Sequence, residues 1–168
     1  LFARSFQLMI EAGSLRVLDI LANASAVIAE GEVLQLATAN DLGTGEAAYL
    51  QMIHGKTAAL FAAATEVGGV IAGAPEAQVQ ALKTYGTALG MAFQIVDDLL
   101  DPEGDEDKAG KALRKDDEQG KQTFVTLMGA EGARAQAKAL VEQACGHLAH
   151  YGEDAGVLCD LARYIVER

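Results

Sequence analysis

The sequence predicts an all-α protein that forms a single domain over residues 1–168. Hydrophobic residues make up 51% of the chain but aromatic residues only 5%, so alanine and leucine supply the apolar content and favour helix over strand. Only two prolines interrupt the 168 residues, which leaves room for long helices. A chain of this length can bury one core, and its composition indicates no second domain.

Capping and turn residues divide the first half of the chain into helices. Gly13 should end the first helix, and Ser14 is placed to cap the second. The turn residues Asn40–Gly45 should separate the second helix from the third, which should end at Gly68 and Gly69. The expected helices span about residues 1–12, 15–38 and 46–67.

The second half should contain a buried helix followed by a long loop. Pro75 is placed to open a helix over about residues 76–100, whose second half is apolar on nearly every face, as is typical inside a helical bundle. Pro102 should end this helix at Leu100. A charged loop should follow from Glu103 to Gln122, and loops of this length in compact domains are usually functional. Three helical segments over about residues 124–128, 130–149 and 155–167 should close the chain.

Charge and cysteine content limit the function classes and the location. A net charge of −11 disfavours nucleic acid or an anionic membrane surface as the main partner, because both attract basic proteins. No apolar run reaches about 18 residues, so we expect no membrane span. Cys145 and Cys159 match no metal-binding spacing, and we interpret them as reduced thiols of a cytoplasmic protein. The apolar start at Leu1 favours a fragment of a longer chain.

Three aspartates at the end of the fourth helix form the centre of the predicted site. Asp97 and Asp101 face the same way on a helix, and Asp98 lies close enough to share a cation with them. Carboxylates at this end of a helix oppose its macrodipole, so they must either stay protonated or be neutralised by a divalent cation. Oxygen ligands with room for water and substrate phosphates suit Mg²⁺. The alternative is a solvated acidic helix end.

Lysines that could meet a phosphate accompany these aspartates. Lys56, followed by Thr57, lies on the third helix, and Lys111 and Lys121 each follow a glycine in the long loop. Each lysine by itself is typical of a solvated surface, so only their combination with the aspartates indicates a phosphate site.

Other phosphate and metal motifs do not fit. A P-loop ending at Lys56 would need glycine where Leu50 stands. An EF-hand loop starting at Asp101 would need glycine and glutamate where Glu106 and Ala112 stand. The three histidines form no metal-ligand spacing, so a surface or core role is the better interpretation for them.

The segment Gly90–Asp101 resembles the second aspartate-rich motif of the trans-prenyl diphosphate synthases. Gly110-Lys111 and Gly120–Thr123 are similar to the loop lysine segments of that family. Lys56-Thr57 resembles its lysine–threonine pair, and Glu30–Glu32 its glycine-acid segment. The resemblance extends over essentially the whole chain.

The resemblance implies a helical bundle of the isoprenoid-synthase type, and a reaction that condenses an allylic diphosphate with isopentenyl diphosphate. Asp97, Asp98 and Asp101 would hold Mg²⁺ against the allylic diphosphate, and Lys56, Lys111 and Lys121 would neutralise that diphosphate. Thr57 and Gln94 would stabilise the developing allylic cation. The family also implies a homodimer.

The resemblance covers only the C-terminal portion of such a synthase, so the bundle is expected to be incomplete. The family's first aspartate-rich motif would precede this chain, and we expect no useful turnover from these 168 residues alone. Segments similar to long-chain and to short-chain synthases both occur, which leaves the product length open. Two alternatives remain open: a binding or regulatory subunit that holds Mg²⁺-diphosphate and pairs with a complete synthase, and a helical interaction module.

Overall fold

The computed structural model describes residues 2–38, 45–103 and 123–167, and every regular element in these ranges is a helix. The prediction of an all-α fold is confirmed. In the part of the chain that the structure describes, no helix is both long enough and apolar enough to cross a membrane. The elements are α1 (Phe2–Glu11), α2 (Leu15–Thr38), α3 (Glu46–Ile53), the π-helical η1 (His54–Ala58), α4 (Ala59–Ile71), α5 (Glu76–Glu103), α7 (Phe124–His147), the 3₁₀-helical η2 (Ala149–Ala155) and α8 (Gly156–Glu167).

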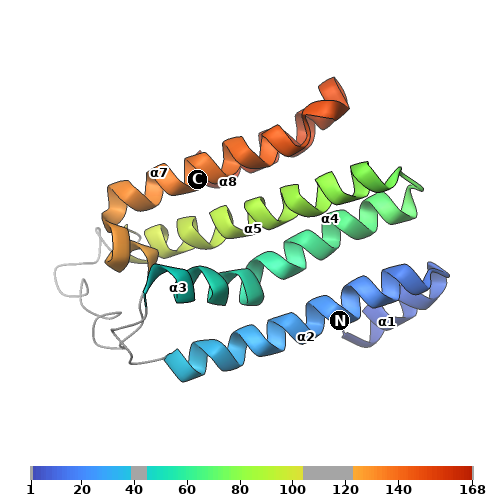
Figure 1. Cartoon of the computed structure of the whole chain (residues 1–168), viewed down its shortest axis with the longest axis horizontal. Coiled ribbons are helices and arrows are strands. Elements are labelled where there is room, and N and C mark those ends of the chain that lie inside the picture. Colours follow the sequence, from blue (N-terminus) through green and yellow to red (C-terminus); the bar gives the residue numbers. More distant parts are fainter. Residues whose placement is uncertain (1, 39–44, 104–122, 168) are drawn as a thin grey trace.

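The long helices lie side by side, and each of α2, α4, α5 and α7 runs roughly antiparallel to the next (Figure 1). Helix α4 contacts both α2 and α5, while α5 also contacts α7 and α8. The C-terminal ends of α2 and α5 lie at the same end of the bundle as the first turns of α3 and α7 (Figure 1). This arrangement brings together side chains that are far apart in the sequence.

Helix α5 runs through the core. Tyr85 and Ala92 pack in one cluster with α7 and α8, and Ile95 packs in a second cluster with α3 and the start of α7. These three residues are fully buried, and each large apolar side chain buried in this way contributes about 1.5–3 kcal/mol. The burial agrees with the sequence pattern that placed this helix inside a bundle.

Two predicted helix ends are wrong. Helix α4 continues through Gly68 and Gly69 to Ile71. Gly69 is useful there, because a Cβ atom at this position would lie 3.0 Å from a methyl carbon of Leu82 on α5. Helix α5 continues past Leu100 to Glu103 and so includes Pro102. Proline has a helical φ angle and removes only one backbone hydrogen bond, which a helix end can accommodate.

Other predicted boundaries are confirmed. Helix α2 begins at Leu15 and ends at Thr38, and Ser14 Oγ accepts a hydrogen bond from the Val17 amide at 3.3 Å. The predicted break between segments 124–128 and 130–149 occurs at Gly129, where φ is 72° inside α7. From residue 104 on, the predicted loop lies outside the described residues.

The two cysteines lie near each other on α7 and α8. Both are free, as the sequence predicts, and Cys145 Sγ contacts the carbonyl oxygen of Cys159 at 4.0 Å. Burial, together with the neighbouring Cys159, raises the pKa of the Cys145 thiol to about 11. A thiol with a raised pKa holds little thiolate at neutral pH, so this pair behaves as part of the packing between the two helices.

Candidate functional site

Glycines allow the backbones around Lys56 and Thr57 to approach one another. A Cβ atom at Gly31 of α2 would lie 2.6 Å from the backbone nitrogen of Lys56, and one at Gly90 of α5 would lie 2.6 Å from Cα of Ala58. Both distances are shorter than any real Cβ contact, so only glycine fits at either position. The η1 segment is therefore held tightly between α2 and α5. Short π-helical segments of this kind occur frequently at functional sites.

A chain of hydrogen bonds connects η1 to the end of α5. The Thr57 hydroxyl donates to Gln94 Oε1 at 2.9 Å, and Gln94 Nε2 donates to Asp98 Oδ1 at 3.1 Å. Gln94 and Asp98 are one helical turn apart on α5, so their side chains lie on the same face. Three residues that the sequence predicts to carry the chemistry are thus in one polar network.

Two further donors reach the other oxygen of Asp98. The Tyr49 hydroxyl donates to Oδ2 from α3, and the backbone N–H of Phe124 donates to the same atom at 3.2 Å. The rings of Tyr49 and Phe124 pack with their centroids 5.6 Å apart. Burial raises the pKa of Tyr49 well above its usual value, and the charge and hydrogen bond of Asp98 raise it further.

The position of Asp98 between two helix ends explains how its charge is tolerated. The C-terminal end of α5 disfavours a carboxylate, but Phe124 is the first residue of α7, where amide groups point outward and favour negative charge. Thr123 and Thr126 form a capping box at the same end of α7. The sequence predicts that these aspartates are protonated or neutralised by a cation. The structure adds neutral hydrogen-bond donors that stabilise the Asp98 carboxylate.

Lys56 lies next to this network but interacts with α2. Its ammonium donates to Gln35 Oε1 at 2.7 Å and lies 3.7 Å from Glu32 Oε1. The lysine side chain is 35% exposed, so an anion from solvent can reach the ammonium group. The contact with Gln35 restricts the side chain, which reduces the entropy lost when it binds an anion.

The predicted site is only partly described. Thr57, Gln94 and Asp98 are joined by hydrogen bonds, while Lys56 and Asp97 lie beside them in the chain. The side chain of Asp101 and all of Lys111 and Lys121 lie outside the described residues. Tyr49 and the Phe124 amide are not predicted from the sequence, because no local pattern relates residues that are 49 and 26 positions from Asp98.

The donor set at this end of α5 fits a divalent cation that is shared with a substrate. Within the described ranges, no group of three or more His, Cys, Asp or Glu side chains is placed to hold a metal ion. Asp97 and Asp98 supply neighbouring carboxylates, and Mg²⁺ typically binds one or two carboxylates together with substrate phosphates.

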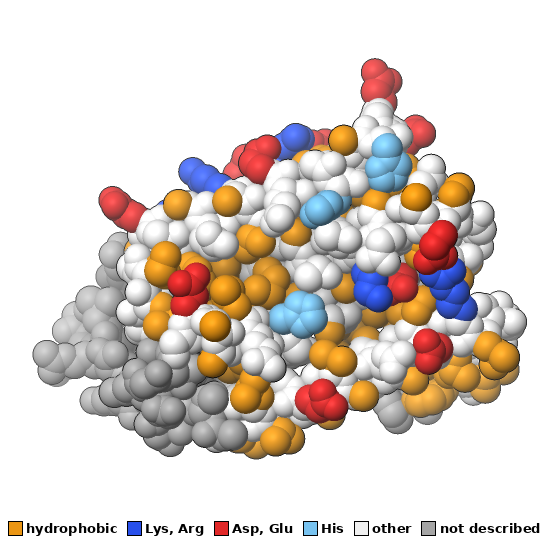
Figure 2. Space-filling model, viewed as in Figure 1, with side chains coloured by type: hydrophobic (Ala, Val, Ile, Leu, Met, Phe, Trp, Pro, Cys, Tyr) orange, Lys and Arg blue, Asp and Glu red, His pale blue; other side chains and the backbone are white. Residues whose placement is uncertain are grey.

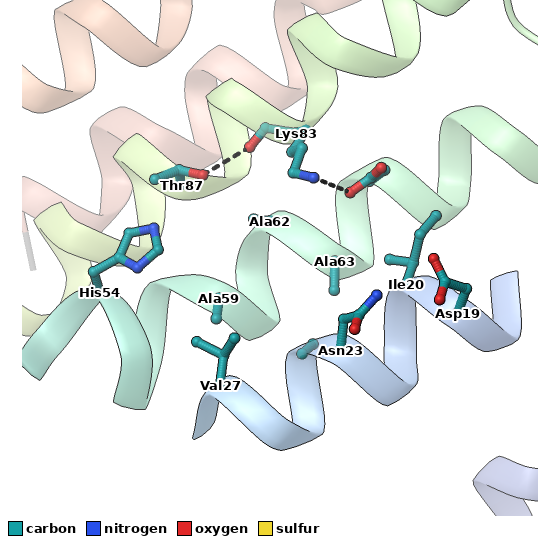
Figure 3. Close-up of a pocket in the computed structure, with 12 residues that line it drawn as sticks. Asp19, Ile20, Asn23, Val27, His54, Ala59, Ala62, Ala63, Lys83 and Thr87 are labelled. Carbon is teal, nitrogen blue, oxygen red and sulfur yellow. Dashed lines mark hydrogen bonds and ion pairs between the residues drawn. The ribbon is translucent and has the colours of Figure 1, made fainter. Parts of the chain in front are cut away.

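A separate cavity of about 240 Å³ lies between α2, α4 and α5 (Figure 3). Lys83 of α5 and the buried Glu66 of α4 form an ion pair across it, with Nζ and Oε2 3.1 Å apart. His54 points into the same space from η1 (Figure 3). None of the predicted site residues lines this cavity, so it is distinct from the Asp98 network.

The chain is similar to proteins of known activity. The family model described as polyprenyl synthetase matches residues 1–155. The octaprenyl diphosphate synthase of Haemophilus influenzae is 43% identical over 144 residues, which is 86% of this chain and 44% of that protein.

Solved structures agree with this similarity. The crystal structure of a decaprenyl diphosphate synthase from Rhodobacter capsulatus matches with a TM-score of 0.87 and 45% identity, covering 99% of this chain and 64% of that one. A polyprenyl synthase from Caulobacter crescentus, complexed with calcium and isoprenyl diphosphate, matches with a TM-score of 0.81 and 35% identity over 99% of this chain and 63% of that one. The chain thus spans about half to two thirds of the length of these proteins.

Proposed function

Because the chain belongs to the polyprenyl synthetase family, we propose that it forms the allylic-diphosphate side of a Mg²⁺-dependent trans-prenyl transferase. In this reaction the C–O bond of an allylic diphosphate breaks, and its electron pair leaves with the diphosphate. The double bond of isopentenyl diphosphate then attacks the allylic cation, and loss of a proton restores a double bond in the longer product. The two substrates are therefore the proposed small-molecule partners.

Residues of η1 and of the C-terminal part of α5 supply two kinds of charge stabilisation in this proposal. The Lys56 ammonium binds the diphosphate, with Lys111 and Lys121 as further proposed partners. Gln94 and Thr57 offer oxygen atoms to the allylic cation, and the bond between them, 2.9 Å long, keeps both in place. Preorganised groups aimed at developing charge usually make the largest contribution to rate enhancement.

Asp97, Asp98 and Asp101 are the proposed Mg²⁺ ligands, and the bound ion would offset negative charge on the departing diphosphate. The Caulobacter relative, complexed with calcium and isoprenyl diphosphate, supports a divalent cation in this family. The observation that carries the proposal is the hydrogen-bonded chain Thr57–Gln94–Asp98, which joins the cation-facing and metal-facing residues.

Calorimetry with inorganic pyrophosphate tests this proposal on the chain itself. Pyrophosphate should bind in the presence of Mg²⁺ and much more weakly without it, because the metal bridges two anions. Asp97→Asn should weaken Mg²⁺-pyrophosphate binding by at least about tenfold, since changes around a metal site typically cost this much or more.

Asp160→Asn is the matched control. Asp160 is an exposed aspartate of α8 that pairs with Arg163 at 3.1 Å, so its replacement should leave pyrophosphate binding unchanged. Equal affinities for the unmutated chain, Asp97→Asn and Asp160→Asn would contradict the metal assignment. So would binding that does not depend on Mg²⁺.

A homodimer in the cytoplasm is also part of this proposal. Apolar side chains lie exposed near the end formed by α1 and the start of α2 (Figure 2). Ile10 and Leu15 are 74% and 84% exposed there. Exposed apolar clusters drive association, so light scattering on the purified chain should give twice the monomer mass. A stable monomer at micromolar concentration would count against the dimer.

A further inference from the structure

Tyr49 is a buried tyrosine whose hydroxyl faces the candidate site. Tyr49 lies on α3 and is only 2% exposed, and its hydroxyl donates to Asp98 Oδ2. The same oxygen accepts from the Phe124 amide at 3.2 Å, and the Tyr49 ring packs on the Phe124 ring. The carboxylate of Asp98 is therefore held from two directions, by a side chain of α3 and by the backbone of α7.

The orientation of Asp98 decides the orientation of Gln94. An ionised carboxylate only accepts hydrogen bonds, so Asp98 Oδ1 requires the NH₂ end of the Gln94 amide, which lies 3.1 Å away. The carbonyl oxygen of the same amide then faces the Thr57 hydroxyl at 2.9 Å. If Asp98 rotated away, the amide could turn over and present its NH₂ group where its oxygen now lies.

We propose that Tyr49 is a positioning residue of the prenyl-transfer site, which fixes Asp98 and through it turns the Gln94 carbonyl oxygen toward Thr57. This role rests on the proposed function. Tyr49 is too deeply buried to contact a substrate, so it acts only through Asp98. An amide that presents oxygen stabilises a neighbouring cation, whereas one that presents NH₂ repels it, so the orientation has a chemical consequence.

Tyr49→Phe is the direct test, because it keeps the ring against Phe124 and removes only the hydroxyl. We expect the dissociation constant of Mg²⁺-pyrophosphate, measured by calorimetry, to rise about tenfold, as for partners that orient a metal ligand. We also expect the side-chain amide signals of Gln94 in a ¹⁵N–¹H spectrum to shift without any metal or ligand added.

Tyr85→Phe is the matched control. Tyr85 is also a fully buried tyrosine, and its hydroxyl donates to the carbonyl oxygen of Leu158 at 2.7 Å. The variant therefore removes a buried hydroxyl as well, but from a contact with α8. This variant should leave both the pyrophosphate affinity and the Gln94 amide signals unchanged. A change of equal size in the two variants would show a general effect of removing a buried hydroxyl and would overturn the proposal.

The two readouts separate this inference from the proposed function. If the unmutated chain fails to bind Mg²⁺-pyrophosphate, the proposed function fails, but the Gln94 signals still test the positioning. Unmoved Gln94 signals in Tyr49→Phe overturn the positioning role even if pyrophosphate binds.

A measurement on the unmutated chain covers the case in which Tyr49→Phe does not fold. The Gln94 side-chain amide protons should exchange with solvent at least about tenfold more slowly than those of the exposed Gln51 on α3, because they are bonded to a fixed carboxylate. Equal exchange rates for the two side chains would overturn the proposal.

Discussion

The two ends of α5 meet their neighbours in different ways. Up to Gly90 the helix packs through small and apolar residues. An added Cβ atom at Gly86 would lie 2.3 Å from Thr65 Oγ1 of α4, and one at Gly90 would lie 2.6 Å from Cα of Ala58 in η1. At its C-terminal end the helix makes hydrogen bonds through Gln94 and Asp98 to three other elements. Close packing therefore fixes the helix up to Gly90, and polar contacts are added to the packing toward its C-terminal end.

The difference indicates where stability and function reside. Close apolar packing contributes stability wherever it occurs, and the free energy of unfolding falls when volume is added to it. A buried polar network contributes less net stability, since each hydrogen bond replaces one to water, but it fixes the direction of each side chain. A carboxylate and an amide held in fixed directions would suit the diphosphate and carbocation chemistry that we propose for this site.

The largest effect should come from adding volume where α5 packs closely against η1. In Gly90→Ala, the new Cβ would lie 2.6 Å from Cα of Ala58, so the backbone of η1 or α5 must move. We expect a loss of about 1–3 kcal/mol in the free energy of unfolding, measured by urea denaturation. The shift of η1 should also disturb the bond from Thr57 to Gln94.

Gly68→Ala is the matched control, because Gly68 also lies inside a helix but has nothing within 4 Å of an added Cβ atom. It should raise the free energy of unfolding by about 0.5–1 kcal/mol, since alanine loses less backbone entropy on folding. If both variants change stability in the same direction, the packing at Gly90 is looser than the structure indicates.

The smallest effect should come from the surface pair at the first turn of α5. Arg16 Nη1 and Nη2 donate to the two carboxylate oxygens of Glu76 at 2.6 Å and 2.7 Å. The hydrogen bond from Arg16 lowers the pKa of Glu76 below 4.5 and raises the pKa of Arg16. Exposed pairs of this kind contribute little and are screened by salt.

The pH dependence of this pair has a definite sign. Because the folded-state pKa of Glu76 is lowered, the pair stabilises the fold fully above the unfolded value near 4.5, and that contribution is lost as the pH falls through the folded pKa. Melting temperatures of the unmutated chain and Arg16→Met should therefore differ slightly at about neutral pH and converge in acid. A difference that grows on acidification would contradict this account.

Much of the fold could be predicted from local sequence signals. Ser14 predicts the start of α2 at Leu15, and Gly129 predicts the break in α7, because caps and glycines with positive φ act within one turn. The ends of α4 and α5 were placed wrongly, because Gly69 is stabilised by packing against Leu82 and Pro102 costs only one bond. Packing against another helix is not visible in a local window.

The candidate site was predictable to the extent that its residues lie within a single motif. Gln94, Asp97 and Asp98 could be found together because they lie within two turns of one helix. The π-helical turn at η1 and the Tyr49 hydroxyl could not, since both depend on contacts between helices. Long-range hydrogen bonds leave no periodic signal in a single sequence.

The crossing of α2 and η1 has a consequence for genetic suppression. An added Cβ at Gly31 would meet Lys56 N, Gly55 C and Lys56 Cα, which are all backbone atoms. A clash between two side chains can be relieved by truncating the partner, but no substitution removes the backbone atoms that meet a Cβ atom here. A damaging change at Gly31 therefore has no second-site suppressor within its own contact, and reversion to glycine is the direct way to restore it.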